Sequence, residues 1–272
     1  MKKFLVGSTM ALLVAALSAC APSNKAQSVS NTQSPADGIV GGKTVSPGSL
    51  LSKQVFMLIG VSPEGQFICT ATLISPQHVL TAAHCVDGAT KLYAVFAVDA
   101  LSDLKERGLQ NNPDVVPVVD KKINPKWVGA KNGAVKGIDA GDIAILKLSK
   151  AAPSNMKVTK LYSYSLNKGQ SLVAAGYGIT SGTTHEGSGL LRETNVVVEE
   201  PLVGHSEFYI DQTNGHGPCS GDSGGPSFVQ NAYGELTQVG ITSRGDETCT
   251  KGGIYTLIPA YSTWISTTVQ SL

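Results

Sequence analysis

The sequence predicts an all-β protein of barrel or sandwich architecture. Short apolar or alternating runs follow one another at close spacing, separated by Gly, Pro, Asn and Ser, and no long stretch with helical periodicity interrupts them. Such runs with turn signals between them are typical of strands. We expect strands at 54–61, 67–74, 93–98, 115–119, 143–148, 171–175, 194–198, 207–210, 226–229, 238–242 and 253–258.

The end of the chain is the exception to this pattern. Pro259 precedes apolar residues that recur at the spacing of one helical face as far as Val269. Because proline suits the first turn of a helix, we expect one terminal helix that packs onto the second lobe. Two stretches rich in Gly, Asn and Lys, 105–113 and 126–140, are expected to be surface loops.

The first 20 residues resemble a signal peptide. Two lysines precede an apolar run that is too short for a stable membrane span, so we expect export of the chain. The ending Leu17-Ser18-Ala19-Cys20 resembles a bacterial lipobox, which predicts cleavage before Cys20, lipidation of its thiol and anchoring at the cell envelope. The alternative is an ordinary signal peptide with a chance cysteine, which predicts a secreted protein.

Residues 21–38 are rich in Ser, Asn, Gln, Pro and Ala, and Val29 is their only bulky aliphatic residue. Such a segment cannot bury enough surface to offset the entropy of ordering it, so we expect a flexible pro-segment or tether. The folded domain is then 39–272. The formal net charge of the chain is +1, which offers no basic stripe for nucleic acid.

Export also affects the interpretation of the cysteines. If Cys20 carries lipid, Cys69, Cys85, Cys219 and Cys249 remain, an even number in an oxidising compartment. Four cysteines allow three pairings, and proximity in sequence favours Cys69–Cys85 and Cys219–Cys249. A zinc site is the competing hypothesis, but no Cys-x-x-Cys pair and no histidine at ligand spacing supports it, so we expect no metal.

The strongest chemical signal is Gly221-Asp222-Ser223-Gly224-Gly225-Pro226. A serine hydroxyl needs a neighbouring base to become a good nucleophile, and flanking glycines let the backbone direct N–H groups at a developing oxyanion. One alternative is a glycine-rich turn that contains serine by chance. Another is the nucleophile elbow of an α/β-hydrolase, but no helical run follows Ser223.

Two further motifs supply a base and an acid. His84 lies in Leu80-Thr81-Ala82-Ala83-His84-Cys85, and Asp142 begins an apolar run that continues to Leu146. With Ser223 they give the order His, Asp, Ser, which differs from the order in α/β-hydrolases and subtilisin. Asp139 is the nearby rival to Asp142. The other histidines, His78, His185, His205 and His216, have no comparable context.

Together these blocks resemble the trypsin/chymotrypsin family of serine proteases. Ile39-Val40-Gly41-Gly42 is similar to the activated N-terminus of that family, and the blocks around His84, Asp142 and Ser223 are similar to its catalytic blocks. The resemblance extends over 39–272. It implies two six-stranded antiparallel β-barrels with the active site between them, and disulfides that match the two local pairings.

The resemblance also assigns roles. His84 is the general base, Asp142 orients its imidazole, and Ser223 is the nucleophile of an acyl-enzyme mechanism. The backbone N–H groups of Gly221 and Ser223 form the oxyanion hole, and no cofactor is required. The partners implied are protein or peptide substrates and protein protease inhibitors, and we expect a monomer.

In this family, cleavage before the Ile-Val-Gly-Gly segment frees an amine that pairs with the acid preceding the serine. Here the pair is Ile39 and Asp222, which predicts a zymogen. The residue before the cut is Gly38, not Arg or Lys, so the resemblance does not identify the activating protease. Loss of the tether at this cut would also release a lipid-anchored enzyme.

The resemblance places the specificity pocket at Gly217, Ser243, Gly245 and Gly253. Gly217 at the floor offers no carboxylate, and the glycine walls leave room for a large side chain, so we expect an apolar or aromatic P1 residue. Arg244 stands where the family usually has an aromatic residue. The alternatives for the whole chain are a non-catalytic binding protein on the same fold, an esterase of the α/β-hydrolase class and a β-rich adhesin.

Overall fold

The computed structural model describes residues 39–129 and 136–272. The predicted signal peptide, Cys20 and the tether at 21–38 lie outside the described residues. Within the described ranges, no helix is long and apolar enough to cross a membrane.

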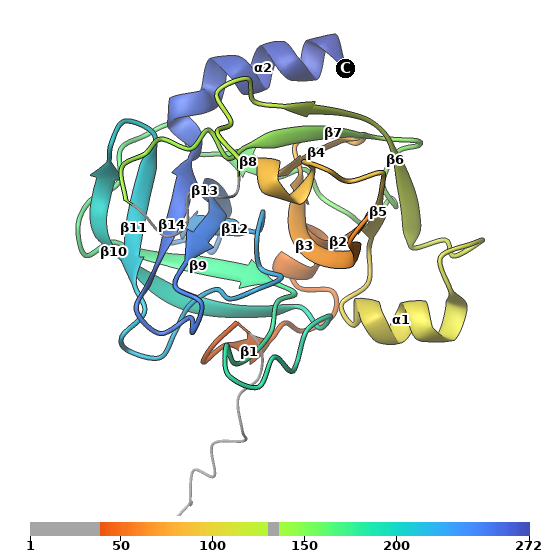
Figure 1. Cartoon of the computed structure of the whole chain (residues 1–272), viewed down its shortest axis with the longest axis horizontal. Coiled ribbons are helices and arrows are strands. Elements are labelled where there is room, and N and C mark those ends of the chain that lie inside the picture. The colour runs from red at the N-terminus through yellow and green to blue at the C-terminus, as the bar shows by residue number, and fades with distance from the viewer. Residues whose placement is uncertain (1–38, 130–135) are drawn as a thin grey trace, which may run out of the picture. The chain divides into compact units, whose positions relative to one another are not determined.

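Six antiparallel strands from the first half of the chain close into a barrel (Figure 1). In barrel order they are β2 (Val55–Ser62), β3 (Gly65–Leu73), β4 (His78–Thr81), β7 (Ala144–Leu148), β6 (Val115–Ile123) and β5 (Lys91–Val95). The longest pairing joins β2 to β3, from Val55 opposite Thr72 to Ser62 opposite Gly65. Buried aliphatic and aromatic side chains, Phe56 and Leu58 among them, fill the interior.

The second half of the chain forms the other barrel. Its order is β9 (Ser171–Gly176), β10 (Arg192–Val203), β11 (Glu207–Asp211), β14 (Gly252–Leu257), β13 (Leu236–Gly245) and β12 (Pro226–Gln230). The ring closes because β9 pairs with both β10 and β12. Two short strands are added outside it: β1 (Lys43–Thr44) beside β10 and β8 (Lys160–Leu161) beside β13. The prediction of two six-stranded antiparallel barrels is therefore confirmed.

Polar contacts join the two barrels along their common boundary. Thr72 of β3 donates its hydroxyl to the amide oxygen of Gln238 in β13, at 2.7 Å. Thr256 of β14 donates to the backbone carbonyl of Asp142, at 2.8 Å. Both contacts are buried, where an unpaired polar group would be costly, so they fix how the barrels meet. The second contact holds Asp142, two residues before β7, against the second barrel.

The predicted C-terminal helix is present as α2 (Ser262–Ser271), after a short 3₁₀ turn, η4 (Ile258–Tyr261), that contains Pro259. Ile265 on its buried side joins the core of the first barrel, and α2 contacts β7, so the expectation that this helix packs onto the second lobe was wrong. A second helix, α1 (Ala100–Arg107), lies within a part of the chain where we expected only strand and loop. Asp99 caps it by accepting a hydrogen bond from the Ser102 N–H, which satisfies one of its free N-terminal groups.

Candidate active site

His84 and Asp142 meet at the edge of the first barrel. His84 lies in the 3₁₀ turn η2 (Ala83–Cys85), three residues after the end of β4, and Asp142 lies two residues before β7. Because β4 and β7 are paired, the two residues are brought together, and Nδ1 of His84 is 2.8 Å from Oδ2 of Asp142. The backbone N–H of His84 donates to the other carboxylate oxygen at 3.0 Å. The carboxylate therefore orients both the ring and the turn that carries it.

Asp142 is 2% exposed, and Ser243 of β13 donates its hydroxyl to Oδ2 at 2.6 Å. Burial acts to raise the pKa of Asp142, but the charge and hydrogen bonds of His84 and the Ser243 hydroxyl outweigh it and hold the pKa below its ordinary value. Burial likewise acts to lower the pKa of His84, and the Asp142 charge outweighs it, so that pKa is raised. Asp142 thus stabilises the protonated imidazole.

Ser223 lies on the second barrel, in the loop before β12. Its carbonyl oxygen accepts a hydrogen bond from Thr70 of β3 at 2.8 Å, which docks the loop on the first barrel. The same carbonyl oxygen is 3.5 Å from Sγ of Cys85, the residue after His84. Ser223 also lines a pocket together with Ser243, whose hydroxyl contacts Asp142. The three predicted triad residues are therefore gathered at the boundary between the barrels.

Within residues 221–225, the backbone N–H groups on either side of Asp222 have no protein acceptor among the described residues. The N–H groups of Asp222, Gly224 and Gly225 each donate to a carbonyl oxygen at 2.8–3.0 Å. Among the described residues, those of Gly221 and Ser223 have no such partner. Gly221 has φ +97°, and a Cβ there would lie 2.8 Å from Cα of Gly178, so glycine is required. These are the two donors predicted to form an oxyanion hole.

The side chain of Asp222 is buried against Gly176 and Gly178 at the end of β9. It is 1% exposed, and its carboxylate accepts the backbone N–H groups of Gly178 at 2.7 Å and Cys219 at 2.9 Å. Burial raises the pKa of Asp222 to about 7, despite these hydrogen bonds and the charge of Arg192, which act to lower it. A cation beside this carboxylate would restore its ionised form.

The segment 39–42 packs against the loop that precedes Ser223. Ile39 is 1% exposed and has φ +47°, a conformation that is strained for a β-branched residue. Val40 accepts a hydrogen bond from the Gly217 N–H at 3.1 Å, and the carbonyl oxygen of Gly41 lies 2.9 Å from Nδ1 of His216. His216 is thus a contact of this segment, a role for which its sequence context gave no signal.

The pocket beside Ser223 has a volume of about 270 Å³. Of the four predicted pocket residues, Ser243, Gly245 and Gly253 line it, and Gly217 does not. Instead the side chain of Gln212 packs against Gly217: a Cβ at Gly217 would lie 2.1 Å from Nε2 of Gln212. Gln212 lines the pocket, although sequence reasoning gave it no role.

A buried ion pair supports the wall of this pocket. Arg244 of β13 binds Glu207 of β11 through two hydrogen bonds of 2.7 and 2.8 Å. Glu207 also accepts the backbone N–H of Ala140 at 3.0 Å, in the loop that leads to Asp142. The pair therefore connects the pocket wall to the segment that carries the candidate acid. Arg244 was noted from sequence as a departure from the family, but its partner Glu207 was missed.

The rival acid, Asp139, is occupied elsewhere. Its carboxylate accepts the backbone N–H groups of His205 and Ser206 and lies 2.9 Å from Nδ1 of His205, whose side chain is 94% exposed. The hydroxyl of Ser206 also donates to Asp139, at 2.8 Å, so this arrangement holds the loop in place at the surface. The geometry favours Asp142 as the partner of the candidate base.

Two disulfides flank the site. Cys69 is bonded to Cys85 and Cys219 to Cys249, the two pairings that are closest in sequence. In the described part of the chain, one group of potential metal ligands lies close together, and it consists of Cys69, Cys85 and His84. Its two sulfur atoms are joined to each other, so they offer no thiolate ligands to a metal. The disulfides indicate folding in an oxidising compartment.

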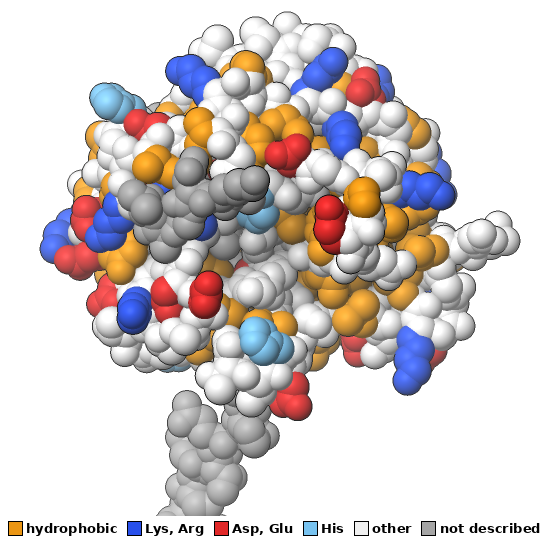
Figure 2. All heavy atoms as spheres, in the orientation of Figure 1, with side chains coloured by type: hydrophobic (Ala, Val, Ile, Leu, Met, Phe, Trp, Pro, Cys, Tyr) orange, Lys and Arg blue, Asp and Glu red, His pale blue; other side chains and the backbone are white. Residues whose placement is uncertain are grey.

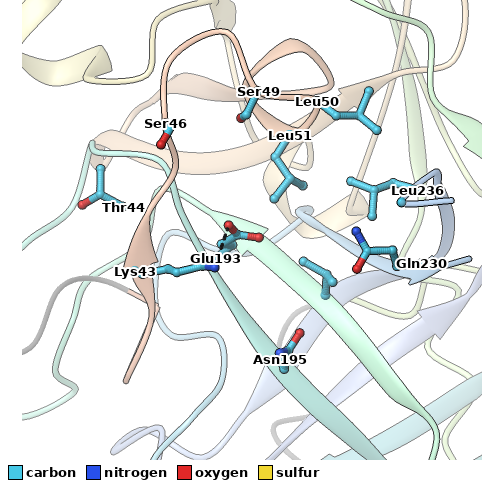
Figure 3. Close-up of a pocket in the computed structure, with 12 residues that line it drawn as sticks. Lys43, Thr44, Ser46, Ser49, Leu50, Leu51, Glu193, Asn195, Gln230 and Leu236 are labelled. Carbon is cyan, nitrogen blue, oxygen red and sulfur yellow. Dashed lines mark ion pairs between the residues drawn. The ribbon is translucent and has the colours of Figure 1, made fainter. Parts of the chain in front are cut away.

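A larger pocket, of about 420 Å³, lies between β1, β9 and β10 and the turn after β12 (Figure 3). Lys43 and Glu193 form an ion pair of 3.5 Å at its side, and no residue of the candidate triad lines it. On the face drawn in Figure 2, Lys and Arg side chains alternate with Asp and Glu. This face offers no single-sign patch for a polyanion.

The comparisons agree with this fold. The Trypsin family model matches residues 39–265, so the chain belongs to the trypsin family. It is 26% identical over 247 residues to a protein named Chymotrypsin from Phaedon cochleariae, covering 84% of this chain and 81% of the relative. It is 29% identical over 235 residues to Serine protease grass from Drosophila melanogaster, covering 76% of this chain and 62% of that relative. Both named relatives are insect proteins.

Proposed function

We propose that the protein is a serine endopeptidase that hydrolyses peptide bonds through His84, Asp142 and Ser223. The observation that carries the proposal is that the buried carboxylate of Asp142 contacts both the ring and the backbone of His84. The loop that carries Ser223 lies beside this pair, and the N–H groups of Gly221 and Ser223 in it have no acceptor among the described residues. A non-catalytic binding protein would have no need for these three side chains together with two open donors.

In this mechanism His84 takes the proton from the Ser223 hydroxyl as the oxygen attacks the substrate carbonyl, and later gives it to the leaving amine. Asp142 holds the tautomer with a proton on Nδ1 and stabilises the imidazolium that forms. The N–H groups of Gly221 and Ser223 bind the oxyanion. Water then hydrolyses the acyl-enzyme by the same route in reverse.

The test uses the chain that starts at Ile39 and an unfolded protein as substrate. New peptide fragments are expected from the unmodified chain and not from Ser223→Ala or His84→Ala. Because only neutral His84 can act as a base, kcat/KM should increase with pH through a pKa above the ordinary 6.5. Equal cleavage by Ser223→Ala would contradict the mechanism.

The chain is further proposed to be a zymogen that is activated by cleavage before Ile39. The new α-amine would pair with Asp222, whose buried carboxylate has a pKa of about 7 and gains most from a cation. An N-terminal residue has no φ angle, so the same cut would also relieve the strained backbone of Ile39. The activating protease must accept Gly38 before the cut.

The uncut form is proposed to be anchored at a bacterial cell envelope through a lipid on Cys20. Neither disulfide joins the tether to the domain, so cleavage before Ile39 would release the enzyme. Metabolic labelling with a fatty acid should mark the uncut chain and leave the active form unlabelled. Active, Ile39-initiated protein that is still covalently joined to a lipidated peptide would refute release.

A further inference from the structure

The side chain of Gln212 fills the space that two glycines leave at the base of the pocket. A Cβ at Gly217 would lie 2.1 Å from its Nε2, and a Cβ at Gly253 would lie 3.1 Å from its Oε1. The amide therefore lies between these two residues. Its backbone is fixed as well, since the N–H donates to Lys251 and the carbonyl accepts from Gly215. Gly217 and Gly253 therefore make room for the side chain of Gln212.

The orientation of the Gln212 amide is determined by its neighbour. Nε2 donates to the carbonyl oxygen of Pro218 at 3.0 Å. The opposite orientation would set two acceptors against each other, so the oxygen must lie on the other side, toward Gly253 and the pocket. Gln212 is 1% exposed, and within the described residues its Oε1 accepts no hydrogen bond. Oε1 is not one of the fully buried unpaired atoms of the described residues, so it stays open to the pocket that Gln212 lines. A ligand that covers it without supplying a donor would leave it buried and unpaired, whereas a ligand with a donor would not.

We propose that Gln212 determines the specificity of the pocket and selects a P1 side chain that ends in an uncharged hydrogen-bond donor, such as the hydroxyl of tyrosine or the amide of glutamine. This proposal rests on the proposed endopeptidase function. A site built to bind a donor discriminates strongly against an analogue that lacks it, because the acceptor is then left buried and unpaired.

The charges around the pocket argue against charged P1 residues. Asp246, Glu247 and Arg244 line it, and because Arg244 is already paired with Glu207, the two acids would repel an acidic side chain. Partial burial acts to raise the pKa of Asp246, but hydrogen bonds from Thr248 and from the backbone of the loop outweigh it and hold that pKa well below its ordinary value. These bonds also occupy both oxygens of Asp246. Gln212 at the base carries no charge that would compensate the desolvation of a Lys or Arg side chain reaching it.

Matched peptide substrates test the proposal. Tyrosine and phenylalanine differ by one hydroxyl, and glutamine and methionine are similar in length but differ in their donors. With the chain that starts at Ile39, we expect kcat/KM to favour Tyr over Phe and Gln over Met by at least about tenfold. The concentration of active enzyme is measured by titration of Ser223 with a fluorophosphonate.

Two variants assign the preference to Gln212. Gln212→Met removes the acceptor and should bring both ratios close to one. Gln212→Glu keeps an acceptor and adds a charge, so it should raise kcat/KM for a P1 lysine peptide at least tenfold relative to P1 Tyr. Gln110→Met, at an exposed loop position, is the matched control and should leave all ratios unchanged.

The outcomes separate this proposal from the proposed function. Equal or faster cleavage after Phe and Met, or unchanged ratios in a folded Gln212→Met variant, would overturn the specificity assignment alone. Fluorophosphonate labelling without cleavage of any of the four peptides would also overturn it while leaving Ser223 as the nucleophile. Absence of both labelling and cleavage would overturn the endopeptidase function and the specificity together.

Discussion

The burial of Asp222 should make the uncut chain less stable as the pH rises from about 4 to 7. In the folded chain its pKa is about 7 instead of 3.8, so the folded state holds this proton where the unfolded state has lost it. Folding then takes up a proton between these pH values, and the free energy of unfolding decreases as pH rises. The pKa of Asp222 differs by about three units between the folded and the unfolded chain, which lowers the free energy of unfolding by about 4 kcal/mol. This decrease is complete above pH 7.

The assay is denaturant unfolding at several pH values, with the uncut chain carrying Ser223→Ala so that it cannot cleave itself. Asp222→Asn in the same background removes the titrating group while leaving all other groups in place, so it should remove this part of the pH dependence. The chain that starts at Ile39 should also lack it, because the α-amine keeps Asp222 ionised. Identical pH dependence with Asp222 and with Asn at that position would refute the reasoning.

Three further predictions follow from the contacts of the site. Asp142→Asn should lower kcat by about 10⁴-fold without preventing folding, as in the Ser-His-Asp template, because His84 then adopts the wrong tautomer; a decrease below tenfold would exclude Asp142 as the orienting acid. Glu207→Gln leaves Arg244, whose side chain is 14% exposed, opposite a neutral group and should destabilise the fold by about 1–3 kcal/mol in denaturant unfolding, whereas an unchanged free energy of unfolding would show that the pair is not needed. Replacing the Cys219–Cys249 disulfide, which closes a loop of 30 residues, by two serines should cost about 3–4 kcal/mol, and an unchanged unfolding midpoint would contradict this.

The barrels were predictable because each strand has its signal in its own short stretch of sequence. Alternation of apolar residues and turn signals identify eleven of the strands, and the register follows once the barrels close. The strand β4 was missed since its four residues run directly into the His84 motif. The helix α1 was missed because a helix of eight residues has little periodicity, although Asp99 before it is a capping signal that could have been used.

The candidate triad was predictable for a related reason. Each of its residues lies in a short sequence motif whose neighbouring residues set the backbone conformation. Gly221, two residues before Ser223, is an example. Gln212 and Glu207 have no such motif. Their roles arise from strand pairing in the second barrel, which places Glu207 beside Arg244 across 37 positions in sequence. Contacts of this kind become visible only when the register is known.

Fluorophosphonate labelling tests the central claim, that Ser223 is an activated nucleophile, most directly. The comparison uses the chain that starts at Ile39, the same chain with Ser223→Ala, and a form that retains residues 21–38. The account predicts labelling of the first alone, with the modification on Ser223 by mass spectrometry. Labelling of the long form as well would contradict control by the Ile39 amine. Absence of labelling in all three correctly folded forms would contradict the catalytic role and favour a binding protein on this fold.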